Sequence, residues 1–125
     1  MLANAPVTTM LPVVDLDRAR RFYEACLGLT PLGQAPDGKY RYAVGGTILA
    51  LFPKPDGTKA VHTAVSFQVA DIDTEVAELE SRGVVFEDFD RPGLKTEAHV
   101  CVLGSEKAAW FKDTEGNWLC IHQDL

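Results

Sequence analysis

The chain has 125 residues and a mass of 13.7 kDa, which is enough for one domain with its own apolar core and too little for two. Twelve Lys and Arg against eighteen Asp and Glu give a net charge of −6, which disfavours binding to nucleic acid phosphates or to an anionic membrane surface. The electrostatic field of this negative charge favours a neutral or cationic small molecule as the partner.

The cysteine content points to a reducing compartment. Three cysteines are an odd number without close pairing, and no basic stretch followed by an apolar segment precedes Pro6. No apolar run is long enough to cross a bilayer. We therefore expect a cytoplasmic protein with reduced thiols.

An internal repeat divides the chain into two halves. The segment VVDLD at 13–17 returns as VADID at 69–73, and GTILAL at 46–51 is echoed by GNWLCI at 116–121. The repeat predicts two modules within a single domain, the first at about 7–52 and the second at about 61–123. A connector rich in Pro and Gly joins them at 53–60.

The first module reads as a strand, a helix and a hairpin. A strand is predicted at 8–14, and Asp15 is a good N-cap for a helix that ends before Gly28. Two further strands at 39–44 and 47–52 form a predicted hairpin around Gly45 and Gly46.

The second module repeats this order. A strand at 62–69 precedes a helix that Asp71 caps and Gly83 ends, and further strands are predicted at 84–89, 108–112 and 117–122. The segment 90–104 is longer than a typical loop. It is compatible with a binding lid and equally with a variable surface excursion.

Alternation along the strands separates two faces. In the strand at 62–69, Val65, Phe67 and Val69 are apolar and should pack under the helices, whereas the other face is mixed in polarity. The same division appears in the other strands. The face of mixed polarity should therefore be either exposed to water or curved around a ligand.

Three segments carry a resemblance to a known family. They are VVDLDRARRFYEACLGL at 13–29, FQVADIDTEVAELESRGV at 67–84 and AWFKDTEGNWL at 109–119. Together they resemble the vicinal oxygen chelate superfamily, which includes glyoxalase I, fosfomycin and bleomycin resistance proteins and extradiol dioxygenases. The resemblance implies an α+β fold in which two βαβββ modules form a curved mixed sheet around a cavity, and a homodimer. It leaves the activity open, because the fold hosts lyases, transferases, dioxygenases and binders without catalysis.

The family's enzymes hold a divalent metal with His and Glu, and this sequence departs from that pattern. The four corresponding positions carry Thr8, Ala50, Ala64 and Cys120. A hydroxyl and a thiol are too few donors for Zn²⁺, Ni²⁺ or Mn²⁺. His62 and His122 do not rebuild the site, because they should lie about 13 Å apart along parallel strands. We therefore expect neither a metal nor another cofactor.

The sequence predicts a metal-free protein that sequesters a hydrophobic, aromatic small molecule such as an antibiotic. The predicted ligand-binding residues are Thr8, Met10, Tyr42, Phe52, His62, Ser66, Trp110, Trp118, Cys120 and His122. One alternative is a metal-dependent lyase, isomerase or dioxygenase with non-standard ligands. Another is metal-free acid and base chemistry by His62 or His122. Cys120 is interpreted as a small buried thiol rather than a nucleophile.

Overall fold

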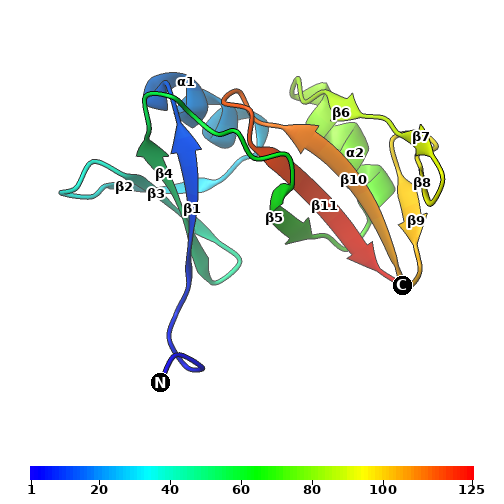
Figure 1. Ribbon diagram of the computed structural model, residues 1–125, viewed down its shortest axis with the longest axis horizontal. Coiled ribbons are helices and arrows are strands. Elements are labelled where there is room, and N and C mark those ends of the chain that lie inside the picture. Colours follow the sequence, from blue (N-terminus) through cyan, green and yellow to red (C-terminus); the bar gives the residue numbers. More distant parts are fainter.

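The computed structural model describes residues 1–125 and contains two large sheets, each with a helix on one side, and a small two-stranded hairpin (Figure 1). The first sheet has the strand order β1-β4-β3-β2, in which β1 and β4 are parallel and the other pairs antiparallel. Its strands are β1 (Thr8–Val13), β2 (Thr30–Gln34), β3 (Tyr40–Val44) and β4 (Thr47–Pro53).

The second sheet repeats this topology. Its order is β5-β11-β10-β6, with β5 parallel to β11, and β9 also pairs with β10. The strands are β5 (Thr63–Gln68), β6 (Phe86–Glu87), β9 (Cys101–Leu103), β10 (Glu106–Lys112) and β11 (Trp118–Asp124). The repeated parallel pair confirms the α+β fold of two βαβββ units.

Both helices begin where the sequence predicts. Helix α1 (Leu16–Arg21) follows Asp15, whose carboxylate accepts from the backbone N–H of Arg18, and continues as the π-helix η1 (Phe22–Cys26). Helix α2 (Ile72–Ser81) follows Asp71, which accepts from the backbone N–H of Thr74. Neither helix has the length and apolar character needed to cross a bilayer.

The predicted strand at 84–89 is much shorter in the structure, and several short strands were not predicted. Only β6 remains of the former, because acidic residues and Pro92 follow it. Strand β2 has the sequence TPLGQ, in which Pro and Gly interrupt the alternation of apolar and polar residues that predicts a strand. The long segment 90–104 contains a small hairpin, β7 (Asp90–Arg91) with β8 (Leu94–Lys95), before β9.

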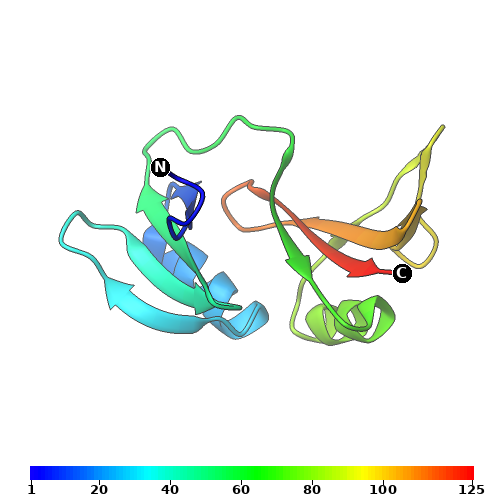
Figure 2. The same ribbon diagram turned by 90° about the horizontal axis from the view of Figure 1, so that it is seen from below.

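The two sheets lie side by side without backbone hydrogen bonds between them (Figures 1 and 2). Strands β1 and β5 each pair on one side only, so each leaves a free edge. Helix α1 packs on the first sheet and α2 on the second, and the apolar core lies between helices and sheets. The sheets are curved and do not close into a barrel. We use "open face" for the side of each sheet away from its helix.

Glu115 in the turn between β10 and β11 joins the two modules. Its side chain is 0% exposed, and one carboxylate oxygen accepts from the backbone N–H groups of Val14 and Asp15 at 2.9 Å each. Both oxygens also accept from the guanidinium of Arg18, at 2.8 and 3.0 Å. A residue of the second module therefore satisfies the backbone at the start of α1 in the first.

Two neighbours of Glu115 extend this contact. The amide of Asn117 donates to the carbonyl of Pro12, and the hydroxyl of Tyr23 donates to Asp113 at 2.6 Å. Asp113, Glu115 and Asn117 are the only buried polar residues of the chain. Because each has hydrogen-bond partners, the buried network joins the modules without leaving these polar groups unpaired. We call these three residues the clamp.

The protonation state of Glu115 depends on its burial and on its hydrogen-bond partners. Burial raises the pKa of Glu115, but hydrogen bonds from Arg18, Asp15, Thr114 and Val14 outweigh burial and lower this pKa from its ordinary 4.5 to about 2. A depressed carboxyl pKa stabilises the fold at pH values above the unfolded pKa. That contribution is lost as the pH falls from about 4.5 to about 2.

We predict that Glu115→Gln lowers the free energy of unfolding by about 2 kcal/mol at pH 7, because the charge-assisted hydrogen bonds are lost. The loss should shrink as the pH falls below about 4.5, because the unfolded wild-type chain then binds a proton at Glu115 that the folded protein does not bind until about pH 2. Urea unfolding at pH 7 and pH 3 measures both effects. Glu78→Gln is the matched control, because Glu78 forms an exposed pair with Arg82. Equal losses in the two variants would contradict the role of the clamp.

Candidate functional site

The open face of the second sheet carries an aromatic cluster. The Phe89 ring lies edge-on to Trp110 at a centroid distance of 5.6 Å and is tilted against Trp118 at 6.3 Å. The indole N–H of Trp110 donates to the hydroxyl of Thr63, and the Lys112 ammonium lies 4.8 Å from the Trp118 ring centroid. The strand β10 alternates, so Trp110 lies on this face while its neighbour Phe111 is buried on the helix side.

Phe89 is a site residue that the sequence analysis did not identify. The sequence analysis placed it at the end of the predicted strand 84–89 and did not assign that strand's faces. In the structure the strand ends at Glu87, and the Phe89 side chain lies against the two tryptophans. The guanidinium of Arg91 lies 5.3 Å from the Phe89 ring centroid. The start of the segment 90–104 therefore adjoins the open face.

A polar group lies beyond this cluster on β5, β10 and β11. The hydroxyl of Ser66 and Nδ1 of His122 are 2.6 Å apart, and Nε2 of His122 is 4.0 Å from Asp124. Glu106, His122 and Asp124 bring one ligand atom each within 4.8 Å of one another. The open face of the second sheet thus has an aromatic part and a polar, acidic part.

The open face of the first sheet is mostly apolar. Register places Met10 of β1 opposite Ala50 of β4, and Ala50 opposite Arg41 of β3. By strand alternation Thr8 and Phe52 lie on the same face. Arg41 is the charged residue among them, and it was not among the predicted site residues.

Two predicted ligand-binding residues are placed elsewhere. Tyr42 is fully buried on the helix side of β3, where its ring packs against Tyr23 and its hydroxyl donates to Glu24. His62 precedes β5 and is exposed to solvent. Tyr42 belongs to the core because alternation puts its neighbour Arg41 on the open face instead. We leave Tyr42 out of the candidate site.

The residues at the expected metal positions do not fit a metal ion. Ala50 and Ala64 have no donor atoms, and the Ala50 side chain is 0% exposed. Cys120 is 4% exposed, and burial raises the pKa of its thiol above the ordinary value. Thr8 alone contributes a neutral hydroxyl. This donor set cannot hold a divalent cation.

The two histidines lie farther apart than expected. Cys120 lies opposite Ser66 in the parallel pair rather than opposite Ala64, and His122 lies opposite Gln68. Since His62 is six residues before Gln68, about 20 Å separates the two histidines along the strands. They cannot share one metal ion.

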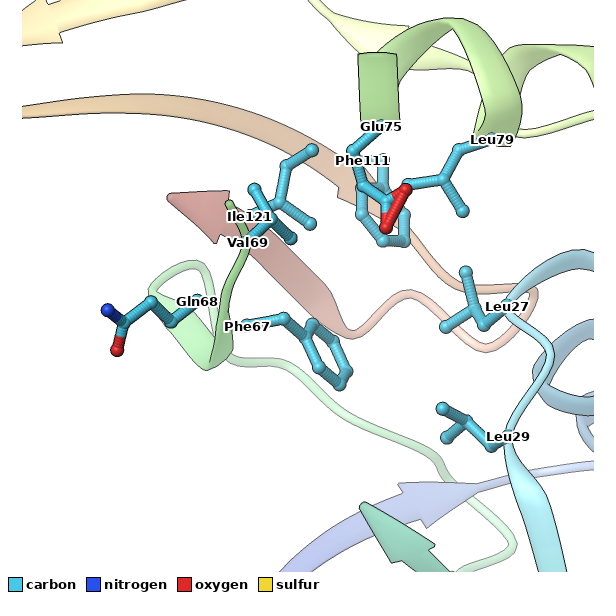
Figure 3. A pocket seen from close by; sticks show the side chains of 9 residues that line it. All are labelled: Leu27, Leu29, Phe67, Gln68, Val69, Glu75, Leu79, Phe111 and Ile121. Carbon is cyan, nitrogen blue, oxygen red and sulfur yellow. The ribbon is translucent and has the colours of Figure 1, made fainter. Parts of the chain in front are cut away.

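A small pocket lies between the modules on the helix side (Figure 3). Its volume is about 220 Å³, and Leu27 and Leu29 of the first module face Phe67, Val69 and other apolar side chains of the second. Glu75 is its charged lining residue, at the start of α2. The pocket is too small for a large flat ligand and contains none of the predicted site residues.

We predict that Cys120 reacts slowly with iodoacetamide in the folded protein, because its thiol is buried and its pKa is raised. Cys26, which is only partly buried, should react at least about tenfold faster at pH 8. Peptide mass spectrometry over time measures both rates, and protein unfolded in urea is the control in which the difference disappears. Faster labelling of Cys120 than of Cys26 would identify an activated thiol.

The family model of the Glyoxalase/Bleomycin resistance protein/Dioxygenase superfamily matches residues 6–121. No curated protein matches the chain in sequence. Several solved structures share its fold at low sequence identity.

Three of these structures illustrate the range of the fold. TnmS3, an antibiotic binding protein from Streptomyces sp. CB03234, has 24% identity and a TM-score of 0.77, with 100% of this chain and 99% of that chain covered. Lactoylglutathione lyase from Agrobacterium tumefaciens has 21% identity and a TM-score of 0.68, covering 98% and 96%. The fosfomycin resistance protein FosX from Listeria monocytogenes has 13% identity and a TM-score of 0.72, covering 98% and 94%. Binders and enzymes therefore share this backbone, and the side chains must decide between them.

Proposed function

Because the chain belongs to the glyoxalase/bleomycin resistance protein/dioxygenase superfamily, we propose that it binds and sequesters a hydrophobic, aromatic small molecule without a metal ion. The observation that carries this proposal is the cluster of Phe89, Trp110 and Trp118 on the open face of the second sheet. No bond of the ligand is made or broken in this function.

The cluster has the properties of a stacking surface. Trp110 and Trp118 are only partly buried, although aromatic rings of this size contribute most when they are covered. Covering apolar surface contributes about 25 cal/mol per Å², from which the cost of association is subtracted. A flat aromatic ligand would cover these rings and gain offset or edge-to-face contacts with Phe89.

The residues at the family's metal positions favour binding over metal-dependent chemistry. Ala50 and Ala64 lack donors, and Cys120 is a buried thiol with a raised pKa. Two of the structures with this fold are described as an antibiotic binding protein and as a fosfomycin resistance protein. For this chain, sequestration of an antibiotic is the corresponding proposal.

We further propose that the protein acts as a cytoplasmic homodimer. In a single chain each open face forms only one wall of a site, and strands β1 and β5 have free edges. A second copy could supply the opposite wall, so that an open face of one protomer covers an open face of its partner. Sedimentation of the purified protein tests this assembly.

We predict that a ligand of this class quenches the intrinsic fluorescence of the protein, because both tryptophans of the chain lie on the proposed face. Titration with a panel of aromatic antibiotics measures the binding. Trp110→Leu and Trp118→Leu should each weaken the affinity by about tenfold or more, while Trp110→Phe should retain most of it. A panel in which no compound binds would overturn the proposal.

One observation favours a second function, a metal-dependent lyase, isomerase or dioxygenase with non-standard ligands. Glu106, His122 and Asp124 form a compact cluster, and the bond between Ser66 and His122 leaves Nε2 of His122 facing the two carboxylates. The cluster is less suited than the family site, because Asp124 is exposed and accepts a hydrogen bond from Gln68.

Metal analysis separates the two functions. We predict that protein purified without a histidine tag contains no stoichiometric divalent metal, because the four family positions lack a suitable donor set. Elemental analysis after dialysis against Zn²⁺, Ni²⁺ or Mn²⁺ measures the content. His122→Ala is the matched variant. If the wild type holds one equivalent of metal and His122→Ala holds none, the second function replaces the first.

A further inference from the structure

Arg41 lies on the open face of the first sheet and has no partner in the chain. Its neighbours Tyr40 and Tyr42 are buried on the helix side of β3, so alternation directs Arg41 to the open face. The Nε atom of Arg41 is buried and has no hydrogen-bond partner. A buried donor without an acceptor costs free energy and is rare in native structures.

The residues opposite Arg41 on the two adjacent strands are a glycine and an alanine, the two smallest amino acids. Register places Ala50 of β4 on one side of Arg41 and Gly33 of β2 on the other. Neither can accept a hydrogen bond through a side chain. An irregularity between Pro31 and Gly33 sets this register, and nothing lies within 4 Å of the position that a Cβ on Gly33 would take. The neighbouring residues on β2 and β4 therefore offer Arg41 no acceptor, and the space above Gly33 is open.

Arg41 differs from the other arginines because it is partly buried and has no partner, whereas Arg21, which also has none, is exposed to solvent. Arg18, Arg20 and Arg82 each pair with a glutamate, and Arg91 lies over the ring of Phe89. None of the chain's ion pairs involves Arg41. The first sheet therefore presents an uncompensated positive charge on an otherwise apolar face.

We propose that Arg41 binds an anionic group of the ligand, a carboxylate or a sulfonate. A guanidinium donates from Nε and from its two terminal nitrogens, so it can bind two oxygens of one such group, and an apolar surrounding strengthens the contact. This inference rests on the proposed function, because it requires the ligand to lie against the open faces. It narrows the ligand class from hydrophobic aromatic compounds to aromatic acids.

The net charge of −6 does not prevent an anionic ligand from binding in direct contact with Arg41. Charges on the surface are screened over about 10 Å at ordinary salt concentrations, whereas the guanidinium would touch the anion directly. Lys39 precedes β3, and its ammonium is already paired with Asp37. Arg41 is thus the free cation of this part of the first sheet.

Two fluorescent probes that differ by one charged group test the assignment. Anilinonaphthalene sulfonate and phenylnaphthylamine share their rings, and only the former carries a sulfonate. Both are titrated into the wild type, Arg41→Met and Arg41→Lys. We expect Arg41→Met to weaken binding of the sulfonate by about tenfold or more and to change binding of the neutral probe by less than about twofold. The affinity of Arg41→Lys for the sulfonate probe should lie between those of the wild type and Arg41→Met. An ammonium keeps the positive charge but lacks the planar arrangement of donors of a guanidinium.

Arg21→Met is the matched control, since Arg21 is exposed on α1 and its removal changes the net charge equally. Thermal unfolding gives a second readout. Arg41→Met should be as stable as Arg21→Met or more stable, because it removes an unpaired buried donor. If Arg41→Met is markedly less stable, or loses a dimer that Arg21→Met keeps, Arg41 pairs within the protein and the assignment is overturned.

The outcomes separate this inference from the proposed function. If both probes bind the wild type and Arg41→Met equally well, the role of Arg41 is overturned while ligand binding stands. If neither the probes nor the antibiotic panel binds the wild type, the proposed function fails, and the inference fails with it. Selective loss of the sulfonate probe in Arg41→Met supports both.

Discussion

The relative placement of the two modules depends on one buried carboxylate. Glu115 belongs to the second module, yet all its backbone partners and its arginine partner lie at the junction of β1 and α1 in the first. The modules are also linked by the segment 54–62, by the contact between the rings of Phe22 and Phe111, and by a hydrogen bond from Arg82 to the carbonyl of Ala25, while their sheets share no backbone hydrogen bond. A buried charge is tolerated here because its partners satisfy both oxygens, which also fixes the direction of approach.

The clamp acts on one side of the molecule only. In the internal repeat Gly45 stands where the second module has Glu115, and Thr47 stands where it has Asn117. Gly45 has no side chain to donate or accept, and the Thr47 hydroxyl donates to the nearby carbonyl of Val44. A pocket of about 370 Å³ lies between this turn and β5. The modules are therefore fixed at one end, and the edges of β1 and β5 stay free.

Sequence alone predicted the modules, the helix caps and the separation of faces, because these follow from local periodicity and from side chains next to the backbone they cap. Asp15 and Asp71 are examples of such local contacts. The clamp could not be predicted, since it joins residues about one hundred positions apart. Arg41 and Phe89 were missed for a related reason. Phe89 matters because it contacts two tryptophans on other strands, and Arg41 matters because its neighbours on the adjacent strands offer no acceptor.

The two open faces differ in chemistry, and this difference bears on how one ligand could be held. The face of the second sheet offers aromatic rings and, beyond them, the acidic group of Glu106 and Asp124. The face of the first sheet offers methyl, thioether and phenyl groups around one unpaired guanidinium. An aromatic acid between two such walls would place its rings against the tryptophans and its anion against Arg41, away from the carboxylates. The reverse orientation would bring like charges together, so the charges of the two walls select one orientation of the ligand.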